Sequence, residues 1–269
     1  MRVIITGAAN GIGRATAERL LDQDLIRGDH RFLLVDRDRD GLAALADEIG
    51  PAAATLAIDV AAADSADRIM VTALAHMGGI DGLVANAGMI AGGGLTDMGT
   101  EDYDRLFAVN TRAVWLLART AHPHLKASRG AMVATGSISA TQPTPALGAY
   151  APAKAALLML VRQLSVEWGP DGIRCNCVSP GPTLTPMTAA GYADPQRRAQ
   201  REAGIPLRKL GTATDVANAI LFLLGPHAGQ ITGIDLPVDG GLSNCLMIAS
   251  GAGSGQARPA SHGGSYGGS

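Results

Sequence analysis

The amino-acid sequence predicts an α/β fold in which a single domain holds a doubly wound, seven-stranded parallel sheet with helices on both faces. Short runs rich in β-branched residues alternate with longer stretches of helical periodicity up to about residue 240, as expected of a parallel sheet covered on both sides. Of the 269 residues, 47% are apolar and 17% are charged, a composition that favours a large buried interior. A chain of this length is still within reach of one domain.

Seven segments are the expected strands, and the stretches between them are the expected helices. Apolar residues recur there at helical spacing, for example at Leu106, Val109 and Val114. Consecutive parallel strands are then joined by right-handed crossovers. The expected strands are Arg2–Thr6, Phe32–Asp36, Thr55–Asp59, Gly82–Asn86, Ala131–Thr135, Arg174–Val178 and Asp235–Val238.

Composition excludes several classes of partner. The formal net charge of -2 offers no basic surface for nucleic acid or an acidic membrane, and only 3% of the residues are aromatic. The apolar run Val3–Ile5 is too short for a signal peptide, and no stretch approaches the roughly 18 apolar residues of a membrane span. Cys175, Cys177 and Cys245 form neither an even disulfide set nor a metal pair. We expect a cytoplasmic protein with a small-molecule partner, no metal, and these cysteines as small core residues.

A glycine-rich turn follows the first strand and leads directly into a helix. Gly7, Gly11 and Gly13 lack a Cβ, so the backbone can approach a pyrophosphate closely, and the first turn of the helix offers free N–H groups to that anion. The spacing differs from the G-x-G-x-x-G fingerprint. A tight turn without any ligand therefore remains an alternative for this motif taken alone.

Polar residues at the ends of the next strands extend the predicted dinucleotide site. Asp36 ends the second strand, where a carboxylate can accept both hydroxyls of an adenosine ribose and would repel a 2′-phosphate. This favours NAD over NADP, although Arg37 or Arg39 could bind a 2′-phosphate instead, and a solvated loop acid is the plain alternative. Asp59, at the end of the third strand, is placed to reach an adenine amino group. After the fourth strand, Asn86–Gly88 lets the chain pass close to the cofactor.

Tyr150 and Lys154 are the predicted acid/base pair. They are four residues apart, hence on one face of a helix, and Pro152 between them falls in the first turn, where proline is tolerated. A free tyrosine has a pKa near 10, so its use as a base near neutrality requires about three units of stabilisation of the phenolate. The lysine ammonium and an oxidised nicotinamide ring would supply it. For an arbitrary pair at this spacing, a surface pair is the more frequent structure.

Three further polar residues accompany this pair. Ser137 and Ser139 follow the fifth strand, at the sheet edge where ligands bind in such folds, and either hydroxyl could hold a substrate oxygen. Ser137 is the preferred candidate, and a serine that caps a turn is the alternative. Asn110 stands in an otherwise apolar helical segment, where a buried amide must find partners. A structural bridge between two elements would satisfy it equally well.

Two segments depart from the strand–helix alternation. Four prolines, Met187, Tyr192 and the basic residues Arg197, Arg198 and Arg201 lie between Pro180 and about Leu210, a long connection that we interpret as a substrate lid over about residues 183–208. From about residue 249 the composition falls to Gly, Ser and Ala, which cannot bury enough surface to order the chain. We expect the folded domain to cover residues 1–248 and a flexible tail to cover 249–269.

These motifs, in this order, resemble the short-chain dehydrogenase/reductase family over roughly residues 2 to 244. The glycine turn resembles its cofactor loop, Asn86–Gly88 its N-A-G element, and Pro180, Gly181 and Thr183 the segment around the nicotinamide carboxamide. The resemblance implies a Rossmann-type fold with Asn110, Ser137, Tyr150 and Lys154 as a catalytic tetrad. It implies a cofactor site of Gly7, Asn10, Gly11, Ile12, Gly13, Asp36, Asp59, Val60, Asn86, Ala87, Gly88, Tyr150, Lys154, Pro180, Gly181 and Thr183.

The resemblance also implies how the protein works. Tyr150 would exchange the hydroxyl proton, Ser137 would hold the substrate oxygen, Lys154 would bind the nicotinamide ribose and lower the tyrosine pKa, and Asn110 would hold a water of a proton relay. Ala9 and Asn10 stand where NADP-preferring relatives often carry a basic residue, which favours NAD. Family members commonly form homodimers or homotetramers, and a homotetramer is expected here. Trp115, Leu116, Leu157, Leu158 and Leu160 belong either to such an interface or to the core.

The leading hypothesis is an NAD-dependent oxidoreductase that acts on a secondary alcohol or ketone, of the alcohol, polyol or diol type. An NADPH-dependent 3-oxoacyl thioester reductase is the first alternative, favoured if Arg37 and the arginines of the lid bind phosphorylated groups. A non-catalytic NAD-sensing protein is the second, although a sensor would not need a proton relay. The substrate pocket is expected around residues 89–94 and 138–145 and near Met187 and Tyr192, whose few charges suggest a neutral substrate.

Overall fold

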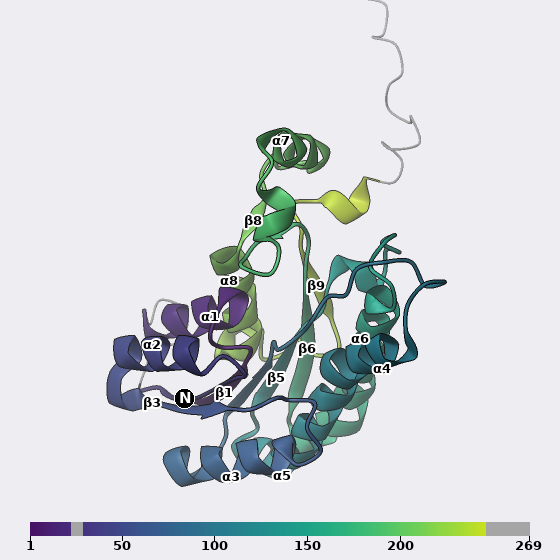
Figure 1. The fold of residues 1–269 in the computed structure, drawn as a ribbon. Coiled ribbons are helices and arrows are strands. Elements are labelled where there is room, and N and C mark those ends of the chain that lie inside the picture. The colour runs from purple at the N-terminus through teal and green to yellow at the C-terminus, as the bar shows by residue number, and fades with distance from the viewer. Residues whose placement is uncertain (23–28, 246–269) are drawn as a thin grey trace, which may run out of the picture.

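The protein's structure, a computed structural model, describes residues 1–22 and 29–245. Within these residues, seven parallel strands form one sheet in the order β3-β2-β1-β4-β5-β6-β9, so the predicted α/β fold is confirmed (Figure 1). The chain reverses its direction of travel across the sheet between β1 and β4, the place where doubly wound folds bind ligands. The strands are β1 (Arg2–Thr6), β2 (Arg31–Asp36), β3 (Ala53–Ala57), β4 (Gly82–Ala85), β5 (Ala131–Thr135), β6 (Arg174–Pro180) and β9 (Asp235–Val238).

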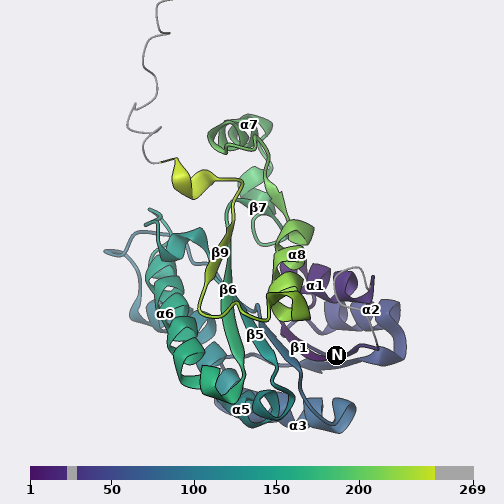
Figure 2. The same cartoon turned by 180° about the vertical axis from the view of Figure 1, so that it is seen from behind.

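Helices cover both faces of this sheet (Figures 1 and 2). Successive side chains of a strand point to opposite faces, so Ile4 packs with α3, α5 and α6, whereas Val3 and Ile5 pack with α1, α2 and α8. Two apolar cores result, one on each face. The helices are α1 (Gly11–Leu21), α2 (Arg39–Ile49), α3 (Ser65–Met77), α4 (Thr100–Phe107), α5 (Ala113–Ser128), α6 (Tyr150–Trp168), α7 (Pro195–Gly204) and α8 (Ala213–Leu224).

Three strands end at other residues than the sequence predicts, and β2 and β3 also begin earlier, at Arg31 and Ala53. β3 ends at Ala57. The N–H of Ile58 makes the last hydrogen bond between this segment and β2, to the carbonyl of Asp36, because β2 itself ends at Asp36. Asp59 therefore lies two residues beyond β3 and not at its end. β4 stops at Ala85, because Asn86 turns toward the glycine loop. β6 continues to Pro180, because β9 pairs alongside it as far as Val238.

Two of the three cysteines lie in the core. Cys175 and Cys177 are buried in β6 as predicted, and burial raises the pKa of both thiols to about 12. The prediction was wrong for Cys245, which is only half-buried because it follows β9 in a short turn.

Of the residues that the sequence assigned either to an interface or to the core, Leu157 and Leu158 belong to the core under α6, whereas Trp115 on α5 is 43% exposed.

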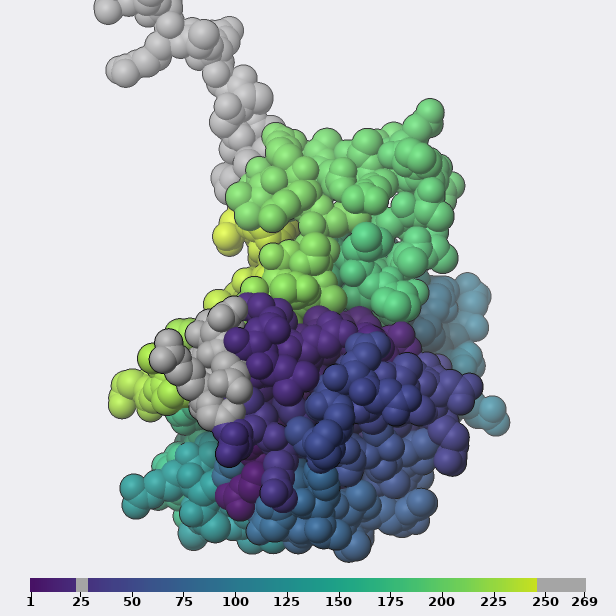
Figure 3. All heavy atoms as spheres, turned by 90° about the vertical axis from the view of Figure 1, so that its left-hand side faces the viewer, coloured from purple at the N-terminus to yellow at the C-terminus, as the bar shows by residue number. Residues whose placement is uncertain are grey.

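The predicted lid segment has its own structure. It begins with β7 (Thr183–Leu184), which pairs in parallel with β8 (Gly211–Thr212), and it carries α7, none of whose residues is buried. Figure 3 shows this green segment as a lobe above the purple and blue body. Across residues 1–22 and 29–245 no helix has the length and apolar character needed to cross a bilayer. The predicted tail over residues 249–269 lies outside the described residues.

Candidate active site at the carboxyl edge of the sheet

The glycine loop brings α1 and the end of β4 close together. Gly7 has a φ of +67°, a conformation that side chains disfavour. A Cβ on Gly13 would overlap the Gly7 carbonyl oxygen and lie 2.7 Å from Asn86 Nδ2. That amide donates to the carbonyls of Thr6 (3.1 Å) and Gly7 (3.2 Å). The first turn of α1, with Gly11 and Ile12, is thereby held at the carboxyl edge of the sheet, where its N–H groups can face an anion.

Asp36 reaches the glycine loop, as its position in the sequence suggests. Its carboxylate accepts the N–H groups of Ala9 (3.1 Å), Arg37 (2.7 Å) and Asp38 (3.1 Å). The end of β2 is therefore tied to the middle of the glycine loop. This arrangement places a carboxylate beside the loop that would hold a pyrophosphate.

Asp59 lies in an ionic cluster that the sequence does not reveal. Burial raises the pKa of Asp59, but hydrogen bonds from Ala61 N–H (2.9 Å) and Arg105 Nη2 (2.6 Å), with the charge of Arg37, outweigh it, so the pKa is lowered. Arg105 stands on α4, 46 residues further along the chain. No local pattern identifies an arginine on an amphipathic helix as the partner of so distant a carboxylate.

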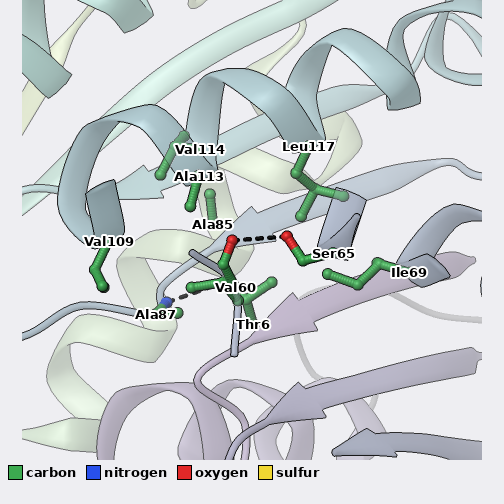
Figure 4. A pocket seen from close by; sticks show the side chains of 10 residues that line it. All are labelled: Thr6, Val60, Ser65, Ile69, Ala85, Ala87, Val109, Ala113, Val114 and Leu117. Carbon is green, nitrogen blue, oxygen red and sulfur yellow. Dashed lines mark hydrogen bonds between the residues drawn. The ribbon is translucent and has the colours of Figure 1, made fainter. Parts of the chain in front are cut away.

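Val60 and Ala87 line a small hollow between the sheet edge and α5 (Figure 4). Thr6 Oγ1 accepts the N–H of Ala87 at 3.1 Å, and Ser65 Oγ donates to the carbonyl of Val60 at 2.7 Å. The polar groups at its floor are thus paired within the protein, and apolar side chains form the rest. The lining residues are Thr6, Val60, Ser65, Ile69, Ala85, Ala87, Val109, Ala113, Val114 and Leu117.

Tyr150, Lys154 and Ser137 come together at the end of β5. Tyr150 is the first residue of α6, and Lys154 follows one turn later with Nζ 5.8 Å from the tyrosine ring centre. Burial raises the pKa of Tyr150, and a hydrogen bond with Ser137 lowers it in part. Ser139 is engaged elsewhere, because its hydroxyl lies 2.8 Å from Thr144 Oγ1. The hydroxyl of Ser137 is therefore the one that the structure places at the phenol.

Lys154 is buried beneath this cluster, with only 4% of its surface exposed. Its ammonium donates to the carbonyl of Thr135 at 2.8 Å. Burial lowers the pKa of Lys154 to about 8, and the nearby thiol of Cys177 opposes this shift. A lysine with this pKa can hold or release a proton close to neutral pH.

The buried lysine gives a pH dependence of stability that can be measured. The folded-state pKa is lower than that of the unfolded chain, so between the two values the unfolded state binds the extra proton. The unfavourable contribution of Lys154 is complete below pH 8 and is lost as pH rises toward 10.5. We therefore expect the free energy of unfolding of the wild-type protein, relative to Lys154→Met, to rise by about 2 to 3 kcal/mol between pH 7 and 10.

Urea unfolding of both proteins at each pH measures this difference. Lys126→Met is the matched control, because the Lys126 side chain is 57% exposed, and its difference from wild type should stay flat. Parallel pH curves for wild type and Lys154→Met would show that the ammonium is not destabilised by burial.

Asn110 is fully buried and bridges two segments. The sequence predicts an α-helix here, but residues Ala108–Arg112 form a π-helical turn between α4 and α5, which re-aims the side chain. The amide donates to the carbonyl of Met89 (3.0 Å) and accepts its N–H (3.1 Å). A Cβ on Gly88 would lie 3.0 Å from Asn110 Oδ1 and 3.5 Å from Lys154 Nζ. The asparagine thus links the segment after β4 to the surroundings of the buried lysine.

The remaining predicted residues lie where β6 ends. Thr183 is buried and its hydroxyl donates to the carbonyl of Gly181 at 2.9 Å. A Cβ on Gly181 would lie 2.6 Å from Asp239 Cβ, so glycine allows Pro180–Gly181 to pass close to the chain after β9. In the part of the chain that the structure describes, no group of three or more His, Cys, Asp or Glu side chains could hold a metal ion.

Comparisons with known proteins show which families and folds the chain is similar to. A family model described as enoyl-(acyl carrier protein) reductase matches residues 7–243. L-rhamnose 1-dehydrogenase (NAD(P)(+)) of Azotobacter vinelandii is 34% identical over 249 residues, covering 89% of this chain and 95% of that protein.

Two solved structures from Brucella melitensis share the fold. One is described as a short-chain dehydrogenase/reductase of glucose/ribitol dehydrogenase type, with a TM-score of 0.83, 33% identity and coverage of 89% of this chain and 95% of that one. The other, 3-ketoacyl-(acyl-carrier-protein) reductase in complex with NADH, has a TM-score of 0.81, 32% identity and coverage of 90% and 97%.

Proposed function

The chain belongs to the short-chain dehydrogenase/reductase family, and from this premise we propose that it interconverts a secondary alcohol and a ketone with NAD as the preferred cofactor. It is an NAD(P)-dependent oxidoreductase that acts on CH–OH groups, as its relatives are. The observation that carries the assignment of roles is the meeting of Tyr150, Ser137 and Lys154 at the end of β5.

The residues at the sheet edge fit a dinucleotide. A Cβ on Gly7 would lie 2.8 Å from Asn86 Nδ2, and one on Gly13 would overlap the Gly7 carbonyl oxygen, so glycine at both positions lets the first turn of α1 pack against the end of β1. The N–H groups of that turn are not capped by the Asn10 side chain and are open to a pyrophosphate. When bound, the nicotinamide supplies the hydride acceptor or donor. Pro180, Gly181 and Thr183 are proposed to hold its carboxamide, and Asp59 with Val60 the adenine.

The chain's own residues would then move the proton. In alcohol oxidation, the Tyr150 phenolate accepts the hydroxyl proton while Ser137 Oγ donates a hydrogen bond to the same oxygen. The Lys154 ammonium stabilises the phenolate because a positive charge favours the ionised phenol. We propose that Asn110, near Lys154, positions a water through which the proton leaves. In the reverse direction Tyr150 donates the proton to the ketone oxygen.

Asp36 supports the preference for NAD. Its carboxylate lies at the glycine loop, where it would accept ribose hydroxyls and repel a 2′-phosphate. Arg37, the alternative partner for that phosphate, lies near enough to Asp59 for its charge to help lower the pKa of that carboxyl. NADP remains the alternative cofactor within the family.

The direct test is absorbance at the reduced-nicotinamide band, with purified protein, NAD or NADP, and a panel of secondary alcohols, polyols and diols. We expect reduction of NAD with at least one secondary alcohol. The matched tertiary alcohol should be inert, because its carbinol carbon has no hydrogen that could be transferred as hydride. Tight binding of NADH without turnover of any CH–OH compound would contradict the proposal and favour the NAD-sensing alternative.

A 3-oxoacyl thioester reductase is the second candidate, favoured by the likeness to the 3-ketoacyl-(acyl-carrier-protein) reductase. The positions of the lid arginines weaken the case for this thioester reductase that the sequence alone makes. Arg197 and Arg198 lie within 3.6 Å and 3.0 Å of Asp194 and Glu202, so their charges are partly neutralised. Oxidation of NADPH by a 3-oxoacyl thioester in the same assay distinguishes the two candidates.

We also propose that the protein is a cytoplasmic homo-oligomer, a dimer or a tetramer. The three cysteines are free thiols, which suits a reducing compartment. Trp115 on α5 and Met159 and Val166 on α6 are 43%, 59% and 75% exposed, so the outer sides of these two helices offer apolar surface to a second copy.

A further inference from the structure

We propose that Asp38 is a second determinant of cofactor choice, which together with Asp36 keeps the 2′-phosphate of NADP away from the ribose end of the site. This inference rests on the proposed NAD-dependent function and assigns its selectivity to an additional residue. Three features of the glycine loop and the β2–α2 turn support it.

The first feature is the side chain of Asn10. Asn10 occupies the N-cap of α1, where asparagine usually accepts an N–H of its own helix, but its side chain makes no such bond. Its amide Nδ2 instead donates to Asp38 Oδ2 at 3.1 Å, 28 residues away. The first-turn N–H groups of α1 are therefore left for a ligand, and the glycine loop is joined to Asp38.

The second feature is the fixed position of Asp38. Its Oδ1 accepts the N–H of Gly41 at 3.0 Å and caps α2. A Cβ on Gly41 would lie 2.7 Å from Asp38 Oδ2 and 2.9 Å from Ala9 Cβ, so the loop and the turn are in close contact. The carboxylate is thus held against the glycine loop from both sides.

The third feature is the charge that results. Asp36 binds Ala9 and Asp38 binds Asn10, so two carboxylates face adjacent residues of the loop. Asp38 also covers the N-terminus of α2, whose N–H groups and dipole would otherwise attract an anion. The proposed function assigns the ribose hydroxyls to Asp36, so the adenosine ribose would lie at this corner. A 2′-phosphate would meet two negative charges there and find the end of α2 already capped.

Asp38→Asn tests the role of the charge with little change in structure. Asparagine is as good an N-cap as aspartate. The Asn10 amide can turn so that its oxygen accepts a hydrogen bond from the side-chain NH2 of the introduced asparagine. Fluorescence titration of the free protein with NADH and NADPH gives both dissociation constants without turnover. We expect NADPH to bind about five- to tenfold more tightly at low salt, and NADH affinity to stay within about twofold. The gain should shrink as salt screens the charge.

Asp40→Asn is the matched control. Asp40 is an exposed carboxylate in the first turn of the same helix, but the bond from Asn10 that joins α2 to the glycine loop goes to Asp38. The ratio of NADPH to NADH affinity should be unchanged in this variant. An equal change in both variants, or no change in Asp38→Asn, would overturn the role of Asp38 and leave the NAD preference standing. A wild-type protein that binds NADPH at least as tightly as NADH would instead overturn the proposed NAD preference itself. Retained NADH affinity shows that each variant is folded.

Discussion

Replacement of Tyr150 by phenylalanine is expected to lower kcat about a thousandfold while NADH affinity stays within about twofold. The substitution removes only the phenol oxygen, so the ring keeps its place beside Lys154 and Ser137. The proton of the substrate hydroxyl then has no acceptor in place, and general acid–base catalysis contributes about this factor. Steady-state kinetics with the best alcohol, together with an NADH titration, measures both quantities.

Tyr103→Phe is the control for this prediction. Tyr103 lies on α4, is 42% exposed and stacks on Phe107 with ring centres 5.0 Å apart, and it has no assigned chemical role. Removal of the phenol oxygen of Tyr103 should leave kcat unchanged within about twofold. If Tyr150→Phe kept more than a tenth of the wild-type kcat, another group would be the acid/base and the assignment of Tyr150 would be wrong.

Gly13→Ala is expected to weaken NADH binding at least about a hundredfold and to lower the melting temperature. The added Cβ would overlap the Gly7 carbonyl oxygen and approach Asn86 Nδ2 to 2.7 Å. The Gly7 carbonyl is backbone, and the Asn86 side chain is held by its bonds to the carbonyls of Thr6 and Gly7. Because neither neighbour can give way easily, α1 must move away from the loop. Its first-turn N–H groups would then no longer face the pyrophosphate. NADH titration and thermal unfolding report the two effects separately.

The matched control is Gly204→Ala at the end of α7. A Cβ there meets no atom within 4 Å, so NADH affinity and the melting temperature should be unchanged or slightly raised. Wild-type NADH affinity in Gly13→Ala would mean that the close approach of α1 to β1 is not required for binding.

The sequence by itself determined the features that depend on near neighbours in the chain. Alternation of short apolar runs with helical periodicity is a local property, and it placed β1, β5 and β9 at the residues where they are found. The glycine turn between β1 and α1 is local as well. Tyr150 and Lys154 share a helix face because one turn separates them, so their proximity follows from periodicity alone.

Only the tertiary structure decided the contacts between distant segments. The end of β3 depends on where its neighbour β2 ends, and the π-helical turn at Asn110 depends on the backbone of Met89 that the amide must reach. Likewise, Arg105 meets Asp59 and Asn10 meets Asp38 only because the crossovers bring these segments to one edge of the sheet. Periodicity specifies which face a residue presents, but the partner across tens of residues is selected by packing of the whole sheet. The glycine loop and the place of Asp36 beside it were therefore predictable from the sequence, whereas the bond between Asn10 and Asp38 was decided by the fold.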